Sequence, residues 1–130
     1  MSEEIQLNLI LRDLINGIEG MQSAAIVSKE GLIVFAINKT GVKDDKTELC
    51  IAAASAILLS TCEKVTKDLV KIGDLDICII QGSDGKFIVM ECGEENIIVC
   101  VFDDDARMDA VFINMRNTAA KIVDLFSQND

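Results

Sequence analysis

The chain has 130 residues, half of them apolar, and 22 Asp and Glu against 12 Lys and Arg give it a net charge of −10. This composition excludes a disordered chain, and the negative charge repels phosphate backbones and anionic lipids, so we expect neither nucleic acid nor a membrane as a partner. The length predicts one domain, residues 1–130. The longest uninterrupted apolar run falls far short of the roughly 20 residues that span a bilayer, and the acidic start does not resemble a secretory signal, so we expect a soluble cytoplasmic protein.

The N-terminal third of the sequence predicts a helix followed by a hairpin. Between Glu3 and Gly17, apolar residues recur every three or four positions, which is typical of an amphipathic helix. Residues 22–28 and 32–38 are rich in Ala, Ile, Val and Phe. The Lys-Glu-Gly sequence at 29–31 between them indicates a tight turn, so we expect two antiparallel strands.

Residues 45–69 predict a second helix, which is apolar nearly all the way round. Asp45 followed by Glu48 resembles a capping box at its start, and lysines near its end suit the negative pole of the helix dipole. Within residues 49–62, only two serines and one threonine are not apolar. Such a helix must be covered on most of its circumference.

Three strands and a third helix complete the predicted order αββαβββα. The strands are expected at 72–81, 86–92 and 97–102, with turns at 82–85 and 93–96, so the three form an antiparallel meander. From Met108 to Phe126, apolar residues step by three or four, which indicates an amphipathic helix.

The polar pattern of the strands predicts their order in the sheet. Residues 24–27 and 97–102 show no polar alternation, which is typical of central strands that helices cover on both faces. Placing these two strands side by side puts the second strand at one edge and the third at the other. We therefore predict an α/β (α+β) fold with a five-stranded antiparallel sheet in the order 2-1-5-4-3. The first and third helices are expected on one face and the second helix on the other.

The second helix is too narrow to cover its face of the sheet alone. One helix is about 10 Å wide, whereas five strands about 4.8 Å apart span more than twice that width. A two-fold dimer that pairs second helix with second helix and third strand with third strand would supply the cover and protect the apolar edge. The alternative is a helix wrapped by its own chain. The predicted dimer interface consists of Ala53, Ala54, Ile57, Leu58 and Thr61 from the helix and Asp76, Cys78 and Ile80 from the strand.

Four segments of the sequence resemble the roadblock family, which includes the dynein light chains of that name and prokaryotic relatives that regulate small GTPases. The resemblance implies a homodimeric or heterodimeric platform, with a sheet continuous across two chains and paired central helices. One departure is Met108-Asp109, where family members often carry a small residue. Longin and profilin-like folds also set helices against a five-stranded antiparallel sheet. The segments are GIEGMQSAAIVSKEGLIVFA (17–36), IAAASAILL (51–59), GDLDICIIQGSDGKFIVMECGEENIIVCVF (73–102) and MRNTAAKI (115–122).

The sequence contains no recognisable catalytic constellation. Histidine is absent, so a Ser or Cys triad lacks its usual base, and the glycines of residues 82–85 join two strands rather than a strand and a helix. The carboxylates of Asp103, Asp104 and Asp105 could hold Mg²⁺ or Ca²⁺, but capping of the last helix is the favoured interpretation. Arg107 could act as an arginine finger on a bound GTPase, although a solvated helical arginine is the simpler interpretation. We expect no enzyme activity and no cofactor.

The five cysteines are scattered and embedded in apolar segments, which predicts reduced thiols in the core. No Cys-x-x-Cys pair is present, so a tetrahedral zinc site would need an unusual set of thiolates and we expect no metal. The cysteines are Cys50, Cys62, Cys78, Cys92 and Cys100.

These features together predict a non-catalytic dimeric scaffold or regulator. The resemblance implies that it binds a small Ras-like GTPase, or another complex subunit, through the paired second helices, and that it pairs with itself or a paralogue. The alternative is a small-ligand-binding sensory domain of similar topology, with an apolar pocket between sheet and helices. An enzyme of unrecognised type would need a reactive cysteine.

Overall fold

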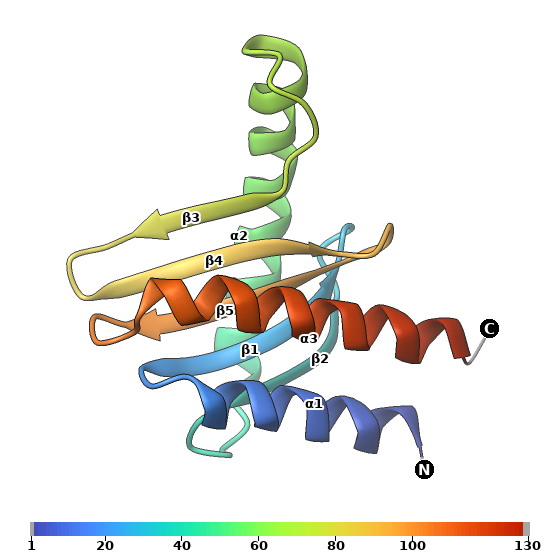
Figure 1. The fold of residues 1–130 in the computed structure, drawn as a ribbon, viewed down its shortest axis with the longest axis vertical. Helices are drawn as coiled ribbons and strands as arrows, with labels where there is room; N and C mark the ends of the chain where they lie inside the picture. Colours follow the sequence, from blue (N-terminus) through green and yellow to red (C-terminus); the bar gives the residue numbers. More distant parts are fainter. Residues whose placement is uncertain (1, 129–130) are drawn as a thin grey trace.

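A computed structural model describes residues 2–128 of the chain. Met1 and residues 129–130, the ends of the expected domain, lie outside this range. The order of helices and strands is the predicted αββαβββα, with a short π-helical segment, η1, continuing the second helix (Figure 1). The elements are α1 (Glu3–Gly17), β1 (Met21–Ser28), β2 (Ile33–Asn38), α2 (Asp45–Lys64), η1 (Val65–Leu69), β3 (Ile77–Gln81), β4 (Gly85–Cys92), β5 (Asn96–Asp103) and α3 (Met108–Gln128).

The five strands form one antiparallel sheet in the order β2-β1-β5-β4-β3, which confirms the predicted α+β topology. Figure 1 shows α1 and α3 side by side on one face of the sheet and α2 on the other. The helix α2 crosses the strands and projects past β3, so its last turns extend beyond the sheet. The apolar central strands β1 and β5 are covered on both faces, as their sequences require.

The face under α1 and α3 holds the larger core. Leu11, Met115 and Ile122 are fully buried there, together with Ile26, Ile98 and other side chains of the central strands. Each fully buried side chain of this size contributes about 1.5–3 kcal/mol relative to its exposed state. Since both helices have one apolar stripe, this face is closed by the chain itself.

The face under α2 is covered much more thinly. The helix α2 buries Ala52, Ser55 and Leu59, a single stripe spaced at three and four residues. Leu75, from the connection to β3, adds a further buried side chain to this cluster. One fully buried stripe of small and medium side chains, with half-buried Ile51 and Cys62 beside it, therefore does the packing between α2 and the sheet.

The N-cap of α2 differs from the prediction by one residue, although the helix begins at Asp45 as predicted. Asp44, rather than Asp45, is the N-cap: its carboxylate accepts hydrogen bonds from the Thr47 backbone N–H (3.1 Å) and hydroxyl (2.7 Å). The predicted capping box of Asp45 and Glu48 is therefore wrong. The backbone N–H and the hydroxyl of Thr47 both donate to the carboxylate three residues before it. This places the N-cap at Asp44, one residue before the predicted one.

The third strand begins at Ile77 and not at residue 72 as predicted. After α2 the chain widens into the π-helical η1, in which the Val70 N–H donates to the Val65 carbonyl oxygen. Lys71 and Gly73 then take positive φ angles of 53° and 104°, which turn the chain back toward the sheet. Residues 72–76 form this connection back to the sheet and do not pair with β4.

Gly85, at the start of β4, marks a close approach of two strands. It lies opposite Asp103 of β5, and a Cβ added at this position would overlap the carbonyl oxygen of Phe102. The turn before it is more open, since a Cβ at Gly82 would meet only the Gly85 carbonyl oxygen, at 3.8 Å. The glycine at 85 is therefore required by the packing of β4 on β5.

Candidate functional site

The outward side of α2 is an apolar surface that the chain itself leaves uncovered. Leu49 is 68% exposed and Ile57 is 67% exposed, although both belong to a helix that packs on the sheet through its other side. Small side chains, Ala53 and Ala54, lie exposed between them. An exposed apolar stripe of this length marks an interaction surface rather than ordinary scattered exposure.

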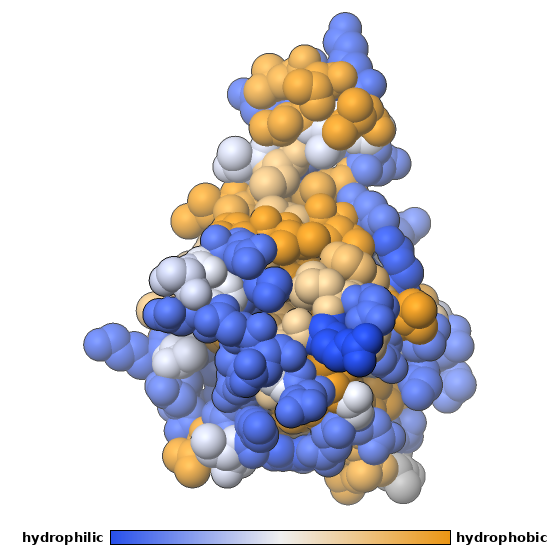
Figure 2. Space-filling view, turned by 60° about the vertical axis from the view of Figure 1, so that its left-hand side comes forward, coloured by the Kyte–Doolittle hydropathy of each residue, from blue (hydrophilic) through white to orange (hydrophobic). Residues whose placement is uncertain are grey.

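The apolar surface continues past the edge of the sheet onto the projecting tip. Leu69, Val70 and Ile72 are 66%, 55% and 75% exposed. Figure 2 shows hydrophobic surface on this tip and on the region below it, whereas the rest of that view is mostly hydrophilic with scattered hydrophobic side chains. We refer to the exposed apolar side chains of residues 49–72 as the α2 surface.

The combined helix of residues 45–69 is long and apolar enough to cross a membrane by length and composition alone. The sequence had led us to expect no such segment. The same test is passed by helices of soluble proteins, and α2 packs on the sheet through Ala52 and Leu59. An apolar face used for protein association gives the same composition.

The edge strand β3 lies beside the α2 surface. Among the described residues it pairs with β4 alone, so its outer backbone groups are open to a further strand. Ile79 and Ile80 are 46% and 43% exposed. A short apolar edge with open N–H and C=O groups is a template for pairing with another chain.

The predicted interface residues fall into three groups. Those from the second helix all lie on α2, where Leu58 is half-buried and the other four are exposed. Cys78 and Ile80 lie on β3 two residues apart, so they share one face of the sheet, and Cys78 packs with the α2 cluster. The sequence-based interface missed Leu49 and the tip, because residues 72–76 were assigned to a strand.

Asp76 occupies a different environment from the other predicted interface residues. It precedes β3, and its carboxylate accepts hydrogen bonds from Arg116 of α3 at 2.6 and 3.1 Å, so its assignment to the third strand is wrong. The Arg116 hydrogen bond lowers the pKa of Asp76 below its ordinary value. The pair ties the return segment to α3.

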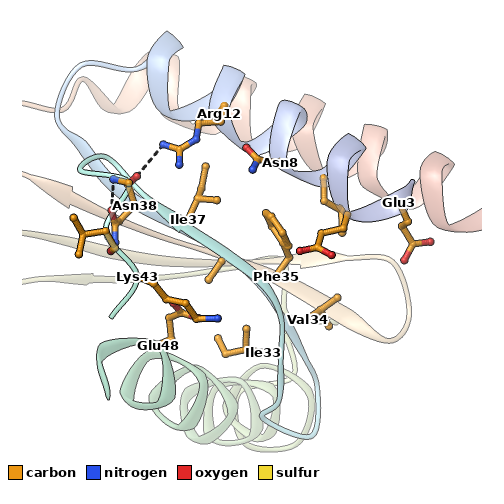
Figure 3. Close-up of a pocket in the computed structure, with 15 residues that line it drawn as sticks. Glu3, Asn8, Arg12, Ile33, Val34, Phe35, Ile37, Asn38, Lys43 and Glu48 are labelled. Atoms are coloured by element: carbon orange, nitrogen blue, oxygen red, sulfur yellow. Dashed lines mark hydrogen bonds between the residues drawn. The ribbon is translucent and has the colours of Figure 1, made fainter. Parts of the chain in front are cut away.

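A groove of about 610 Å³ lies between α1 and the other edge strand, β2. Figure 3 shows Asn8 and Arg12 of α1 on one side and Phe35 and Ile37 of β2 on the other. The Arg12 guanidinium donates a hydrogen bond to the Asn38 carbonyl oxygen (3.1 Å), which partly covers this edge. The groove is open and largely polar, unlike the enclosed apolar pocket expected for a sensory domain.

A small apolar cavity lies between the sheet and the start of α2. It has a volume of about 40 Å³ and is lined mainly by Ala24, Ala25, Ala36 and Ile51. Ligand pockets typically hold about 300–1,000 Å³, so a metabolite does not fit in this cavity.

The acidic run after β5 organises a turn. Asp103 accepts hydrogen bonds from the Asp105 N–H and the Gln22 side-chain amide, both at 2.9 Å. The sequence predicted that the run Asp103-Asp104-Asp105 caps the last helix. The helix α3 begins only at Met108 and the Asp103 carboxylate is used in the turn before it, so this prediction is wrong for Asp103. Within residues 2–128, no three His, Cys, Asp or Glu side chains gather to hold a metal ion. Arg107 is exposed and pairs with Asp109 at 3.5 Å.

The cysteines occupy three kinds of environment. Cys92 and Cys100 are buried, as predicted, and burial raises the pKa of the Cys92 thiol to about 12 and that of Cys100 further still. Cys50 is exposed, which contradicts the expectation of a core thiol. Cys62 and Cys78 are half-buried and adjacent, and burial followed by the contact with Cys62 raises the pKa of Cys78 to about 11. Protonated buried thiols are poor nucleophiles.

Comparison with known proteins agrees with this architecture. The profile of the Roadblock/LC7 domain matches residues 7–102. An uncharacterized protein of Methanocaldococcus jannaschii is 30% identical over 112 residues, which cover 86% of this chain and 93% of the relative.

Solved structures share the fold at low sequence identity. Myxococcus xanthus MglB has a TM-score of 0.83 and 15% identity, and the match covers 98% of this chain and 99% of MglB. A structure described as MglB with tetrameric arrangement has a TM-score of 0.77 and 15% identity, and the match covers 98% and 93% of the two chains.

Proposed function

The chain belongs to the Roadblock/LC7 domain family, and from this premise we propose that it is a non-catalytic, cytoplasmic dimer that serves as a scaffold or regulator for a small Ras-like GTPase or another complex subunit. The dimer forms through α2 and β3 of two copies, or of one copy and a paralogue. Its partner binds around the paired α2 helices.

The open α2 surface beside an open sheet edge is the observation that carries this proposal. The two features are neighbours, because α2 crosses the sheet near β3 and its projecting end extends past this edge strand (Figure 1). A two-fold axis near β3 would join the two sheets through their edges and lay each projecting α2 over the partner's sheet. Ile57 and Ile80, exposed in the single chain, would then be covered.

The exposed apolar side chains of the α2 surface supply a driving force for a dimer. A side chain such as Leu49 or Ile57, about two-thirds exposed, contributes about 1–2 kcal/mol on burial. Burial of several such side chains from each copy acts against the loss of translational and rotational freedom on association. The tetrameric arrangement reported for MglB, a protein of the same fold, supports self-association.

The GTPase partner rests on the family resemblance and on the character of the site. The α2 surface offers apolar contacts and no catalytic group, while the exposed Arg107 is paired with Asp109. A surface of this kind binds and positions a partner; it does not supply chemistry. We therefore assign this protein a regulatory or tethering role.

Equilibrium sedimentation of the wild-type protein tests the dimer. We expect a particle of twice the 14.1 kDa chain mass at micromolar concentration. A particle of 14.1 kDa throughout the micromolar range would overturn the dimer, and with it the paired-helix site.

Affinity capture from cytoplasm tests the partner. Immobilised wild-type protein, with a variant carrying Ile57→Asp in a parallel column, is incubated with extract charged with a non-hydrolysable GTP analogue or GDP. We expect mass spectrometry to find a small GTPase enriched on the wild-type column alone. Equal recovery on both columns, or no GTPase on either, contradicts the proposal.

The groove between α1 and β2 supports a second candidate function, recognition of a polar small ligand in an open groove rather than in the enclosed apolar pocket expected of a sensory domain. Its volume of about 610 Å³ suits a metabolite, and its lining includes the charged side chains of Arg12 on one side and of Lys43 and Glu48 on the other (Figure 3). A ligand that binds only the folded protein raises its melting temperature. Thermal unfolding against a panel of nucleotides and metabolites tests this candidate, with Lys43→Ala expected to abolish any shift that the groove produces.

A further inference from the structure

Two thiols from different elements meet where α2 lies over the edge strand. Cys62, in the last turn of α2, and Cys78, the second residue of β3, have Sγ atoms 3.4 Å apart. Both side chains are half-buried, at the margin of the cluster between α2 and the sheet. The other cysteines have no such partner: Cys50 is exposed on α2, and Cys92 and Cys100 belong to the core on the opposite face.

The separation is close to what a covalent bond requires. A disulfide has an S–S distance of about 2.05 Å, so the two sulfur atoms need to approach by about 1.4 Å. A movement of this size is small compared with the reach of two half-buried side chains. The two sulfur atoms are therefore in direct contact, which is closer than cysteines that merely lie in the same region of a protein.

The surroundings favour a disulfide over a bound metal. Zinc sites in proteins use three or four protein ligands, and no third His, Cys, Asp or Glu side chain in residues 2–128 joins this pair. Without a third ligand, the two sulfur atoms suit a disulfide better than a metal site.

We propose that Cys62 and Cys78 are an oxidation site that forms an intrachain disulfide by exchange with small-molecule disulfides. The Cys62 thiolate attacks one sulfur of the small disulfide, forms a mixed disulfide and releases one thiol. The Cys78 sulfur then loses its proton, attacks the Cys62 sulfur and releases the second thiol. The protein gives up two electrons and two protons, and the small disulfide is reduced to two thiols.

The order of the two attacks follows from the environment of Cys78. Its position between α2 and the sheet, and its contact with Cys62, raise the pKa of its thiol, so it remains protonated at neutral pH. It is therefore the second nucleophile, since intramolecular attack on an adjacent mixed disulfide compensates for a low thiolate fraction.

The bond would fix the most exposed segment of the molecule. Residues 63–77 carry the projecting tip, including Leu69, Val70 and Ile72, and the return through Lys71 at positive φ. The disulfide closes this segment into a loop and holds the end of α2 against β3. Because both elements form the proposed dimer interface, oxidation would pre-organise that interface, a consequence that rests on the proposed function.

The test uses oxidised glutathione on the folded wild-type protein, followed by denaturation and alkylation of the remaining thiols. We expect three of the five cysteines to be alkylated, a mass decrease of about 2 Da before alkylation, and a Cys62–Cys78 cross-linked peptide after proteolysis. The melting temperature of the oxidised protein should rise by roughly 10 °C, and reduction with dithiothreitol should reverse the shift. Five alkylated cysteines, or a persistent glutathione adduct without the cross-link, overturns the proposal.

Variants and a gel locate the bond. Cys50→Ser, the matched control on α2, should form the cross-link as the wild type does, whereas Cys62→Ser and Cys78→Ser should each retain a glutathione adduct or a free thiol. Non-reducing electrophoresis should show the single-chain band. A covalent dimer band, or a stoichiometric zinc complex of the reduced protein that blocks oxidation, contradicts an intrachain disulfide site.

The result is separable from the proposed dimer. A cross-linked protein that sediments as a single chain supports the disulfide and refutes the dimer. A dimeric protein that never forms the cross-link refutes the disulfide and leaves the dimer in place.

Discussion

Substitution of Ile57 by Asp separates the dimer interface from the fold of the single chain. Ile57 is 67% exposed on α2, so Asp at this position meets water in an isolated chain. Surface substitutions of this kind change folding stability by about 0.5 kcal/mol or less, with a similar small loss of helix propensity. Any large effect of Ile57→Asp must therefore come from contacts with a second chain.

The size of the effect follows from burial and two-fold symmetry. Covering the exposed part of Ile57 contributes about 1–2 kcal/mol per copy, and an unpaired carboxylate in an apolar contact costs several kcal/mol more. Each dimer contains the substitution twice. We therefore expect a loss of about 4 kcal/mol or more, which raises the dissociation constant at least about 1,000-fold.

Ile113→Asp is the matched control for this experiment. Ile113 is 64% exposed, nearly the same as Ile57, but it lies on α3 on the opposite face of the sheet. Both variants make the same chemical change in the middle of a helix, so they share any general effect of charge or helix propensity.

Equilibrium sedimentation with interference optics is the suitable assay, because the chain contains no Trp and no Tyr to absorb at 280 nm. Wild type and Ile113→Asp should sediment as dimers at micromolar concentration, and Ile57→Asp as a folded single chain by circular dichroism. A dimer of Ile57→Asp with unchanged affinity would remove Ile57 from the interface. Dissociation of both variants would show that the effect does not depend on the α2 surface.

Three further predictions concern the fold itself. Gly85→Ala should lower the free energy of unfolding by about 1–3 kcal/mol in urea titrations because a Cβ there overlaps the facing strand, whereas Gly82→Ala, in open space, should change it by less than about 0.5 kcal/mol. Met115→Ala, on the fully packed face, should lower it by about 2–5 kcal/mol and leave the sedimentation mass of the folded protein unchanged; a monomer would show that the two faces are not independent. The hydroxyl and then the backbone N–H of Thr47 hold the pKa of Asp44 below its ordinary value of 3.8, so its stabilising effect is present above about pH 3.8 and is lost as the pH falls through the lowered folded pKa. The melting temperature of Asp44→Ala should therefore lie below that of wild type at neutral pH and approach it in acid, and equal melting temperatures at neutral pH would contradict this cap.

The topology was predictable because it depends on patterns that many residues share. The central strands are apolar throughout, and the helices α1 and α3 each have one apolar stripe, so strand order and helix placement follow from what must be buried. Single errors do not alter such an assignment. The roadblock resemblance uses the same patterns, and the match to the Roadblock/LC7 domain confirms it.

The errors occurred where one or two polar side chains decide the structure. The N-cap of α2 is Asp44 rather than Asp45 because Thr47 donates twice, and neither periodicity nor charge distinguishes two adjacent aspartates. The start of β3 was predicted too early because residues 72–76, Ile-Gly-Asp-Leu-Asp, include apolar and acidic side chains in a pattern that also fits a strand. The positive φ of Lys71 that turns the chain there has no signal in the sequence.

Contacts between distant residues were the least predictable part of the site. Cys62 and Cys78 are 16 positions apart, and their meeting depends on how far α2 runs before the π-helical segment turns the chain back. The predicted interface on α2 needed only helical periodicity, and its residues remain a prediction until the association of the chain is measured. Prediction of the contact between the two thiols would also have required the length and direction of the segment that returns from α2 to β3.

The two faces of the sheet divide stability from interaction. The face under α1 and α3 is closed by long buried side chains and can hold the fold without a partner. The helix α2 buries only Ala52, Ser55 and Leu59 and leaves apolar side chains such as Leu49 and Ile57 exposed. A chain that needed α2 only for stability would carry polar side chains on its outer side, as most surface helices do. Retaining leucine and isoleucine there makes the isolated chain prone to association, and this exposure is useful only if another surface normally covers it.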